Sequence, residues 1–200
     1  MNKTGWSLLG ALAVAGGTAY LSWHPLGAGS PRPASPSAAL NLAPVVTPVE
    51  WKTYSDSELH LSIDSPFELR VTKPPVGEVK SVEMEGNDLW QKFYITLKAQ
   101  ELRGYEPDMA RELDAQVKLL QSMNAFLRNL QVETHPVTLA LATGLMAEGS
   151  CHVPGRTAWT IQFLKLRKDA ILLDLLIQYE PTAEGKAAAE RVLSSLGFNN

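Results

Sequence analysis

The stretch TAWTIQFLKLRKDAILLDLLIQY, residues 157–179, decides the fold of this 200-residue chain. Within it, every second residue is apolar on both sides of a turn-prone Lys168-Asp169 pair, a pattern that predicts an antiparallel hairpin. The alternating residues are Trp159, Ile161, Phe163, Ile171, Leu173, Leu175, Ile177 and Tyr179. Leu164 and Leu166 place apolar groups on the opposite face as well. A sheet that is apolar on both faces must be covered on both faces.

Two amphipathic segments are long enough to provide that cover. Residues 106–131 repeat apolar side chains at intervals of three and four, which predicts a helix with one core-facing stripe, and Pro107 suits its first turn. The stripe comprises Met109, Leu113, Val117, Leu120, Met123 and Leu127. Residues 182–198 predict a closing helix with Thr182 as N-cap and Gly197 as its end.

Further strands are indicated before and between these segments. Leu59, Leu61 and Ile63 alternate with polar residues, and residues 67–71 resume the alternation after a break. Residues 79–86 and 88–102 predict two strands joined by a turn at Gly86-Asn87-Asp88.

The strands after the first helix complete the predicted sheet. Residues 137–142 lead through Gly144 into a strand at 145–153, and Pro154-Gly155-Arg156 forms the next turn. The fold class expected is α/β of the α+β type: an α/β/α sandwich whose mainly antiparallel sheet is covered by two long helices. An N-terminal hydrophobic helix and a Pro-rich tether precede it.

The N-terminal segment has the features of an export signal. Residues 4–23 contain no charge and, as a helix, would be about 30 Å long, enough to cross a bilayer. A signal peptide cleaved after small residues and an uncleaved signal-anchor helix both fit, and the aromatic residues Tyr20 and Trp23 favour the anchor. Because Lys3 precedes the segment, the remainder of the chain is expected outside the cytoplasm.

Three regions follow from this composition. Residues 1–23 are the signal peptide or signal-anchor helix, residues 24–49 are a Pro/Ala/Ser-rich flexible tether, and residues 50–200 are the globular domain. The expected location is a bacterial inner membrane with a periplasmic domain, or the periplasm or exterior if the segment is cleaved. After Lys3 and Arg32 the chain holds 16 basic and 21 acidic residues, a net charge of −5, which disfavours nucleic acid as a partner.

The order of the elements resembles the PsbP-like superfamily, which includes PsbP, Mog and bacterial DcrB-like proteins. The resemblance covers residues 51–198 and rests on LHLSIDSP, the mid-chain helix, ATGLMAEG, the hairpin at 157–179 and the closing LSSLGF. It implies a non-catalytic module that binds or stabilises other proteins. It carries over no site residues, since the superfamily shares no catalytic signature.

Few residues of the sequence indicate a catalytic or metal-binding site. Cys151 is the only cysteine, so no intramolecular disulfide can form, and its neighbour His152 would point to the opposite face of a strand. A site formed by Cys151, His152 and His60 is the strongest catalytic or metal-binding hypothesis, and buried or isolated side chains are the simpler interpretation. Glu83 and Glu85 share a strand face and could take part in acid–base catalysis or bind calcium, but a solvated edge of the sheet is the favoured interpretation.

We therefore assign no catalytic, cofactor-binding or metal residues, and we expect a non-enzymatic protein. The predicted function is an exported or membrane-tethered periplasmic protein-interaction domain, whose partner is another envelope protein. The alternatives are a carrier of small hydrophobic ligands or lipids, with a pocket between sheet and helix, and a chaperone-like binder of hydrophobic segments. Trp51, just after the tether, is expected to hold the start of the domain onto its body.

Overall fold

The computed structural model describes residues 50–73, 79–88, 92–123, 127, 130–151 and 158–198, all within one compact unit, Val46–Asn200. The predicted membrane segment, the tether, Trp90, His152 and the turn at residues 154–156 lie outside the described residues. Within them, neither helix has the length and apolar character needed to span a membrane.

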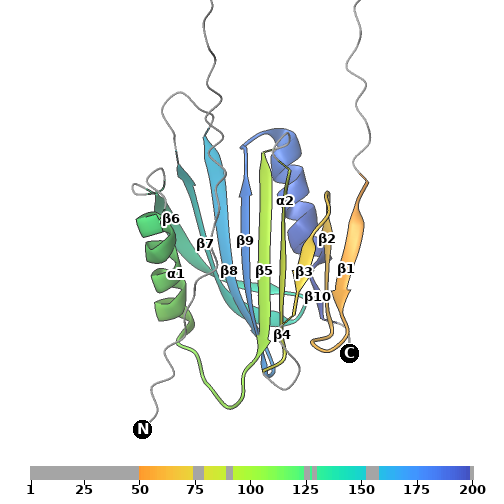
Figure 1. Cartoon of the computed structure of the whole chain (residues 1–200). Coiled ribbons are helices and arrows are strands. Elements are labelled where there is room, and N and C mark those ends of the chain that lie inside the picture. Colours follow the sequence, from red (N-terminus) through yellow and green to blue (C-terminus); the bar gives the residue numbers. More distant parts are fainter. Residues whose placement is uncertain are drawn as a thin grey trace, which may run out of the picture. The chain divides into compact units, whose positions relative to one another are not determined.

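A seven-stranded sheet forms the centre of the domain, in the order β3-β4-β5-β9-β8-β7-β6 (Figure 1). Each of its neighbouring pairs is antiparallel. The strands are β3 (Arg70–Thr72), β4 (Ser81–Asp88), β5 (Phe93–Glu101), β6 (Gln131–Leu139), β7 (Ala142–Cys151), β8 (Trp159–Lys168) and β9 (Ile171–Tyr179). A second sheet, β1-β2-β10, consists of β1 (Lys52–Asp56), β2 (Leu61–Ser65) and β10 (Gly197–Phe198).

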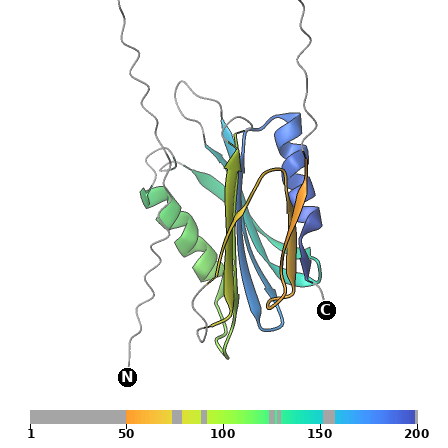
Figure 2. The same cartoon turned by 45° about the vertical axis from the view of Figure 1, so that its right-hand side comes forward.

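One helix lies on each face of the large sheet, as predicted (Figure 2). The first, α1 (Met109–Met123), contacts β7 and β8, whereas α2 (Ala183–Ser195) contacts β9 and, on its other side, β2. The helices have 15 and 13 residues, so the expectation of two long helices is met only in part. The predicted sandwich is otherwise confirmed, with the small sheet as an addition to the α2 layer that the sequence pattern did not indicate.

The main core lies between the large sheet on one side and α2 with the small sheet on the other. One continuous cluster joins Leu61 and Ile63 of β2, Val192 of α2, and the alternating residues of β5 and β9. Trp51 packs against this cluster, and the Arg191 guanidinium of α2 lies 4.1 Å from its ring centroid. This contact fits the predicted role of Trp51 in holding the start of the domain in place.

The hairpin at 157–179 forms as predicted, with one correction to its turn. Thr160 pairs with Tyr179 and Lys168 with Ile171, so the two turn residues are Asp169 and Ala170 rather than Lys168 and Asp169. The positive φ of Asp169, 52°, is consistent with a two-residue turn between right-handed twisted strands.

Two other predicted turns are wrong. Residues Gly86 to Asp88 continue β4, where a Cβ on Gly86 would lie 2.7 Å from the Glu68 carbonyl oxygen. The β6–β7 hairpin turns at Ala140 and Leu141, which have positive φ values of 48° and 68°, and not near Gly144. Both glycines allow the backbone of a neighbouring segment to approach closely. The sequence alone had indicated turns at these positions.

The element ends also differ from expectation. Only Arg70–Thr72 of the predicted 67–71 segment forms a strand, and Leu59 lies in the turn before β2. Asp108 accepts from the Arg111 amide at 3.1 Å and caps α1, which puts Pro107 outside the helix. Thr182 caps α2 as predicted, accepting from the Gly185 amide at 3.0 Å, but Gly197 begins β10 instead of a left-handed helix end.

Candidate functional site

The residues favoured by the catalytic hypothesis are separated by the fold. His60 lies exposed in the turn between β1 and β2 of the small sheet, while Cys151 ends β7 of the large sheet and is buried. Burial raises the pKa of the Cys151 thiol, which keeps it protonated and a poor nucleophile at neutral pH. The third member, His152, lies outside the described residues.

Metal binding finds no support in the part of the chain that the structure describes. There, no three His, Cys, Asp or Glu side chains come close enough together to hold a metal ion.

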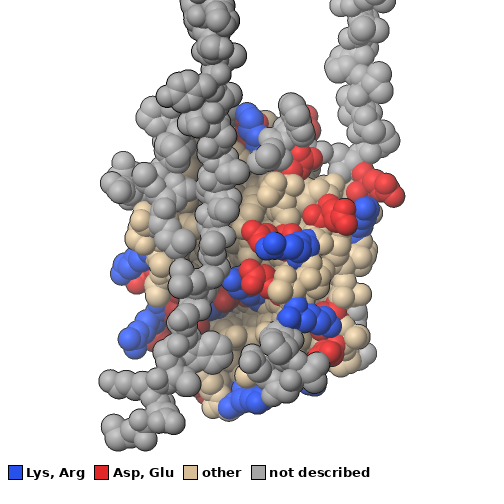
Figure 3. Space-filling model, in the orientation of Figure 1, with Lys and Arg blue, Asp and Glu red and all other residues tan. Residues whose placement is uncertain are grey.

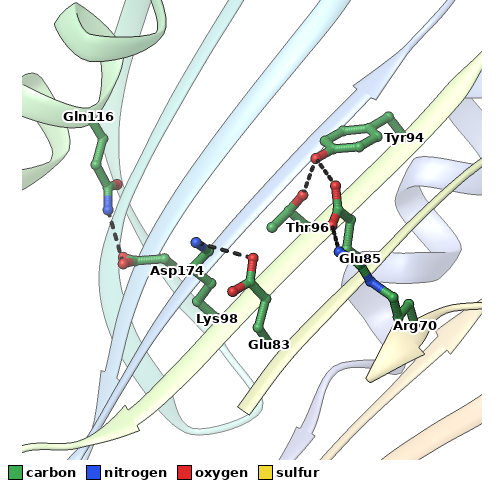
Figure 4. A network of polar contacts seen from close by, with 8 residues as sticks. All are labelled: Arg70, Glu83, Glu85, Tyr94, Thr96, Lys98, Gln116 and Asp174. Carbon is green, nitrogen blue, oxygen red and sulfur yellow. Dashed lines mark hydrogen bonds and ion pairs between the residues drawn. The ribbon is translucent and has the colours of Figure 1, made fainter. Parts of the chain in front are cut away.

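Glu83 and Glu85 do share a face of β4, as predicted, and each has a basic partner. The Lys98 ammonium lies 3.1 Å from Glu83, and Arg70 donates to Glu85 at 3.1 Å (Figure 4). Tyr94 also donates to Glu85, at 3.1 Å, and accepts from Thr96 at 2.6 Å. Burial, together with the negative charge of Glu85, raises the pKa of Tyr94 to about 12.

Glu83 and Lys98 are the exposed end of a longer arrangement, which we call the charged row. The strand registers place Glu83 opposite Lys98, Lys98 opposite Asp174, and Asp174 opposite Lys165, so the charge alternates across β4, β5, β9 and β8. Figure 3 views the face of the sheet on which these mixed charges lie. Opposite charges on neighbouring strands attract each other, and the row is therefore balanced within itself.

The other end of the charged row is buried beneath α1. The Lys165 side chain is 2% exposed and its ammonium lies 2.6 Å from Asp174 and 3.0 Å from Glu112 of α1. Gln116, one turn further along α1, donates to the second Asp174 oxygen at 2.9 Å. These contacts join the helix to the sheet and leave the buried ammonium with two carboxylate partners.

A second arrangement lies on the opposite face, which also carries α2, and we call it the acidic row. It consists of Glu133 of β6, Glu148 of β7 and Gln162 of β8, which the registers place directly opposite one another. Gln162 pairs on its other side with Ile177, a member of the core cluster, which fixes the face. The row lies beyond the strands that α2 contacts.

Each helix thus covers only part of its face of the sheet. On one face α1 contacts β7 and β8, so β4 and β5 carry the open part of the charged row (Figure 3). On the other face α2 contacts β9, and the acidic row lies on β6, β7 and β8.

Both rows were missed by the sequence analysis, although a signal was present. Lys165 and Asp174 interrupt two apolar strands and lie at equal distances from the true turn, Asp169-Ala170. The predicted turn lies one residue too early, and its register would pair Asp174 with Phe163. The ion pair between Lys165 and Asp174 is therefore not predicted.

The comparisons with known proteins support the fold. No family model and no curated protein matches the sequence. Cyanobacterial PsbP (CyanoP) from Synechocystis sp. PCC 6803 has a similar structure, with a TM-score of 0.51 and 12% identity over 80% of this chain and 98% of CyanoP. This similarity confirms the predicted PsbP-like fold.

Two further solved structures were found at lower similarity. One is a protein from Bacteroides thetaiotaomicron VPI-5482, with a TM-score of 0.42 and 13% identity, covering 74% of this chain and 48% of that one. The other is LpqN, involved in cell envelope biogenesis of Mycobacterium tuberculosis, with a TM-score of 0.41 and 14% identity, covering 78% and 88%.

Proposed function

We propose that this chain is an exported, non-catalytic domain that binds another protein of the cell envelope, and that its N-terminal segment holds it at or directs it across the inner membrane. The observation that carries the proposal is the partial cover of the sheet, because each face presents polar side chains on rigid strands next to a helix. The PsbP-like fold and the uncharged segment at residues 4–23 support it.

The faces of the sheet are better suited to binding than its edges. At one edge β3 has only three residues. At the other, β6 pairs with β7 along nine residues, including Pro136 opposite Leu145. A proline fits a continuous ladder where its nitrogen points to the free edge, and there it removes a donor that an added strand would need.

A catalytic role is poorly supported by the same geometry. The Cys151 thiol is buried with a raised pKa, and Glu83 and Glu85 are both in contact with basic side chains. A carrier of apolar ligands is also less well supported, because the side chains between the sheet and α2 form one packed cluster.

The proposal is tested by fractionating cells that express the full chain, determining its N-terminus by mass spectrometry, and crosslinking in intact cells. An envelope protein crosslinked to a chain in the membrane or periplasm is the expected result. An intact Met1 in the membrane fraction would identify the segment as an anchor, and a start near Tyr20 would identify a cleaved signal. Recovery of the chain in the cytoplasm, or no crosslinked protein, would contradict the proposal.

A further inference from the structure

The turn of the β6–β7 hairpin is made of residues that its backbone conformation disfavours. Ala140 and Leu141 have positive φ values of 48° and 68°, and they connect the paired residues Leu139 and Ala142. Two-residue turns with positive φ at both positions favour Asn-Gly, Asp-Gly or Gly-Gly. In other residues the Cβ comes too close to the following carbonyl oxygen, and a bulky side chain is an outlier there. The turn therefore holds backbone strain.

The Leu141 side chain is also the most exposed of the large apolar side chains in the described part of the chain. It is 83% exposed, whereas Val71, Tyr105 and Leu119 range from 42% to 57%. Leu119 lies in α1, where leucine is a good helix former, so its exposure has a local explanation. Leu141 has no such explanation, because its backbone conformation disfavours a leucine and its side chain is largely in solvent.

The hairpin below this turn is fixed to the domain. Ala142 is fully buried, Val137 and Leu139 pack against the main core cluster, and Thr143 pairs with Arg167 of β8. Figures 1 and 2 both show the turn at the end of the domain where α2 ends and β10 begins. Backbone strain persists only where the surrounding structure enforces it, and such strain is concentrated at binding and catalytic sites. The hairpin thus presents Leu141 in a fixed position, which lowers the entropy cost of a contact.

An apolar pocket in a protein fits Leu141 better than a lipid surface does. Complete burial of one leucine side chain corresponds to a factor of about 10 to 150 in affinity. A lipid surface, by contrast, holds a protein through several apolar side chains together with cations. The neighbouring turn of the sheet, between β8 and β9, presents Asp169 and Ala170 instead, both exposed.

We propose that Leu141 anchors the β6–β7 hairpin to the envelope partner by filling an apolar pocket of that protein. The free domain holds the strain and the exposed apolar surface, and binding buries that surface. Because β6 and β7 lie beyond β9, which α2 contacts, a partner on their open face also reaches the turn. The inference rests on the proposed function, and it adds the anchoring residue and the apolar character of the partner's site.

The test places a photoreactive residue at Thr143, an exposed position two residues from Leu141, in the full-length chain in intact cells. An envelope protein should be captured, and capture should depend on the apolar side chain. Leu141→Gln keeps the strained turn but removes the apolar surface, so it should reduce capture at least tenfold. Leu141→Met should keep at least half of it. The matched control is Leu119→Gln, at the other exposed leucine, and it should change capture less than twofold.

A second variant separates binding from folding. Ala140→Asn combined with Leu141→Gly gives the turn its favoured residues, so it should raise the urea midpoint of the full-length chain in nonionic detergent by about 0.5 M. The same double variant should reduce capture at least tenfold. A lower urea midpoint would overturn the proposal, since Leu141 would then serve the fold. Equal capture by Leu141→Gln and the unaltered chain would also overturn it.

The captured molecule distinguishes this inference from the proposed function. A lipid crosslinked at Thr143, identified by mass spectrometry, would reject the protein pocket and assign the turn to the bilayer. An envelope protein found by general crosslinking but not captured at Thr143 would keep the binding function and reject Leu141 as its anchor. No crosslinked protein by either route would reject both.

Discussion

Two rows of polar side chains cross the sheet, one on each face, and they differ in whether their charges are balanced. The charged row alternates as Glu83, Lys98, Asp174 and Lys165, and ends against Glu112 of α1. The acidic row consists of two carboxylates and an amide whose oxygen has no hydrogen-bond partner among the described residues.

The difference indicates distinct roles. Each carboxylate of the charged row has a lysine partner within the domain, and the buried end joins α1 to the sheet. Among the described residues, no lysine or arginine forms an ion pair with Glu133 or Glu148 of the acidic row. A row that folding leaves unbalanced is a better indicator of a binding surface than one that folding completes.

The largest effect is expected at the buried end of the charged row. Lys165→Met removes the ammonium but leaves Asp174 and Glu112 beneath α1, and removing one member of a buried ion pair costs about 3–5 kcal/mol. Both carboxylates are 28% exposed, so water can solvate them in part and reduce this cost. We expect the free energy of unfolding in urea to fall by about 3 kcal/mol. Lys98→Met at the exposed end is the control, and an equal loss there would show that burial is irrelevant.

A smaller effect of opposite sign is expected in the acidic row. Glu133→Lys converts its first two members into an alternating pair and should stabilise the domain by about 0.5 kcal/mol in the same measurement. Glu133→Gln, which only removes the repulsion, should gain less. A loss of stability in Glu133→Lys would mean that a cation outside the described residues already balances the charge of Glu148.

A still smaller effect is expected from Glu83→Gln at the exposed end of the charged row. The Glu83 and Lys98 side chains are 40% and 37% exposed, and exposed ion pairs contribute about 0–1 kcal/mol. We expect a loss of a few tenths of a kcal/mol that disappears in 1 M salt, measured by urea unfolding at both salt concentrations. A loss comparable with that of Lys165→Met would show that the row acts as one cooperative unit.

The architecture could be predicted from the sequence because buried strands and helices place apolar residues at regular intervals along the chain. The hairpin at 157–179, the apolar stripe with Leu113, Val117 and Leu120, and the Thr182 cap are local patterns, and all three are confirmed. Turn positions were harder to predict from the sequence. Gly86 and Gly144 are not turn residues but allow a neighbouring segment to approach closely, and no local sequence pattern reveals that segment.

The rows could not be predicted because they depend on register. Glu133 and Glu148 are fifteen positions apart in the sequence, and only the turn at Ala140-Leu141, an unusual pair for positive φ, places them opposite one another. A shift of one residue in a hairpin turn would separate the pair that its two strands form, Glu133–Glu148 in one hairpin and Lys165–Asp174 in the other. Glu83 and Glu85, by contrast, lie on one strand, so their shared face followed from the sequence.

The smallest effect expected concerns the proton affinity of Tyr179, which lies near the acidic row. Burial raises the pKa of the Tyr179 phenol from 10.0, and the negative charges of Glu148 and Glu190 raise it further. Glu148→Gln should therefore lower this pKa, as measured by NMR of carbon-13-labelled tyrosine with Tyr179→Phe to assign the signal.

The same shift has a consequence for stability at high pH. A raised pKa means that the folded state retains the proton longer than the unfolded state, so stability is unaffected below pH 10 and falls as the pH rises through the folded pKa. In Glu148→Gln the loss of stability at high pH should begin at the same pH but be smaller. The reason is that the Tyr179 pKa values of the folded and unfolded states would lie closer together. An unchanged Tyr179 pKa in this variant would mean that the Glu148 charge is already neutralised, and the distinction between a balanced and an unbalanced row would then no longer hold.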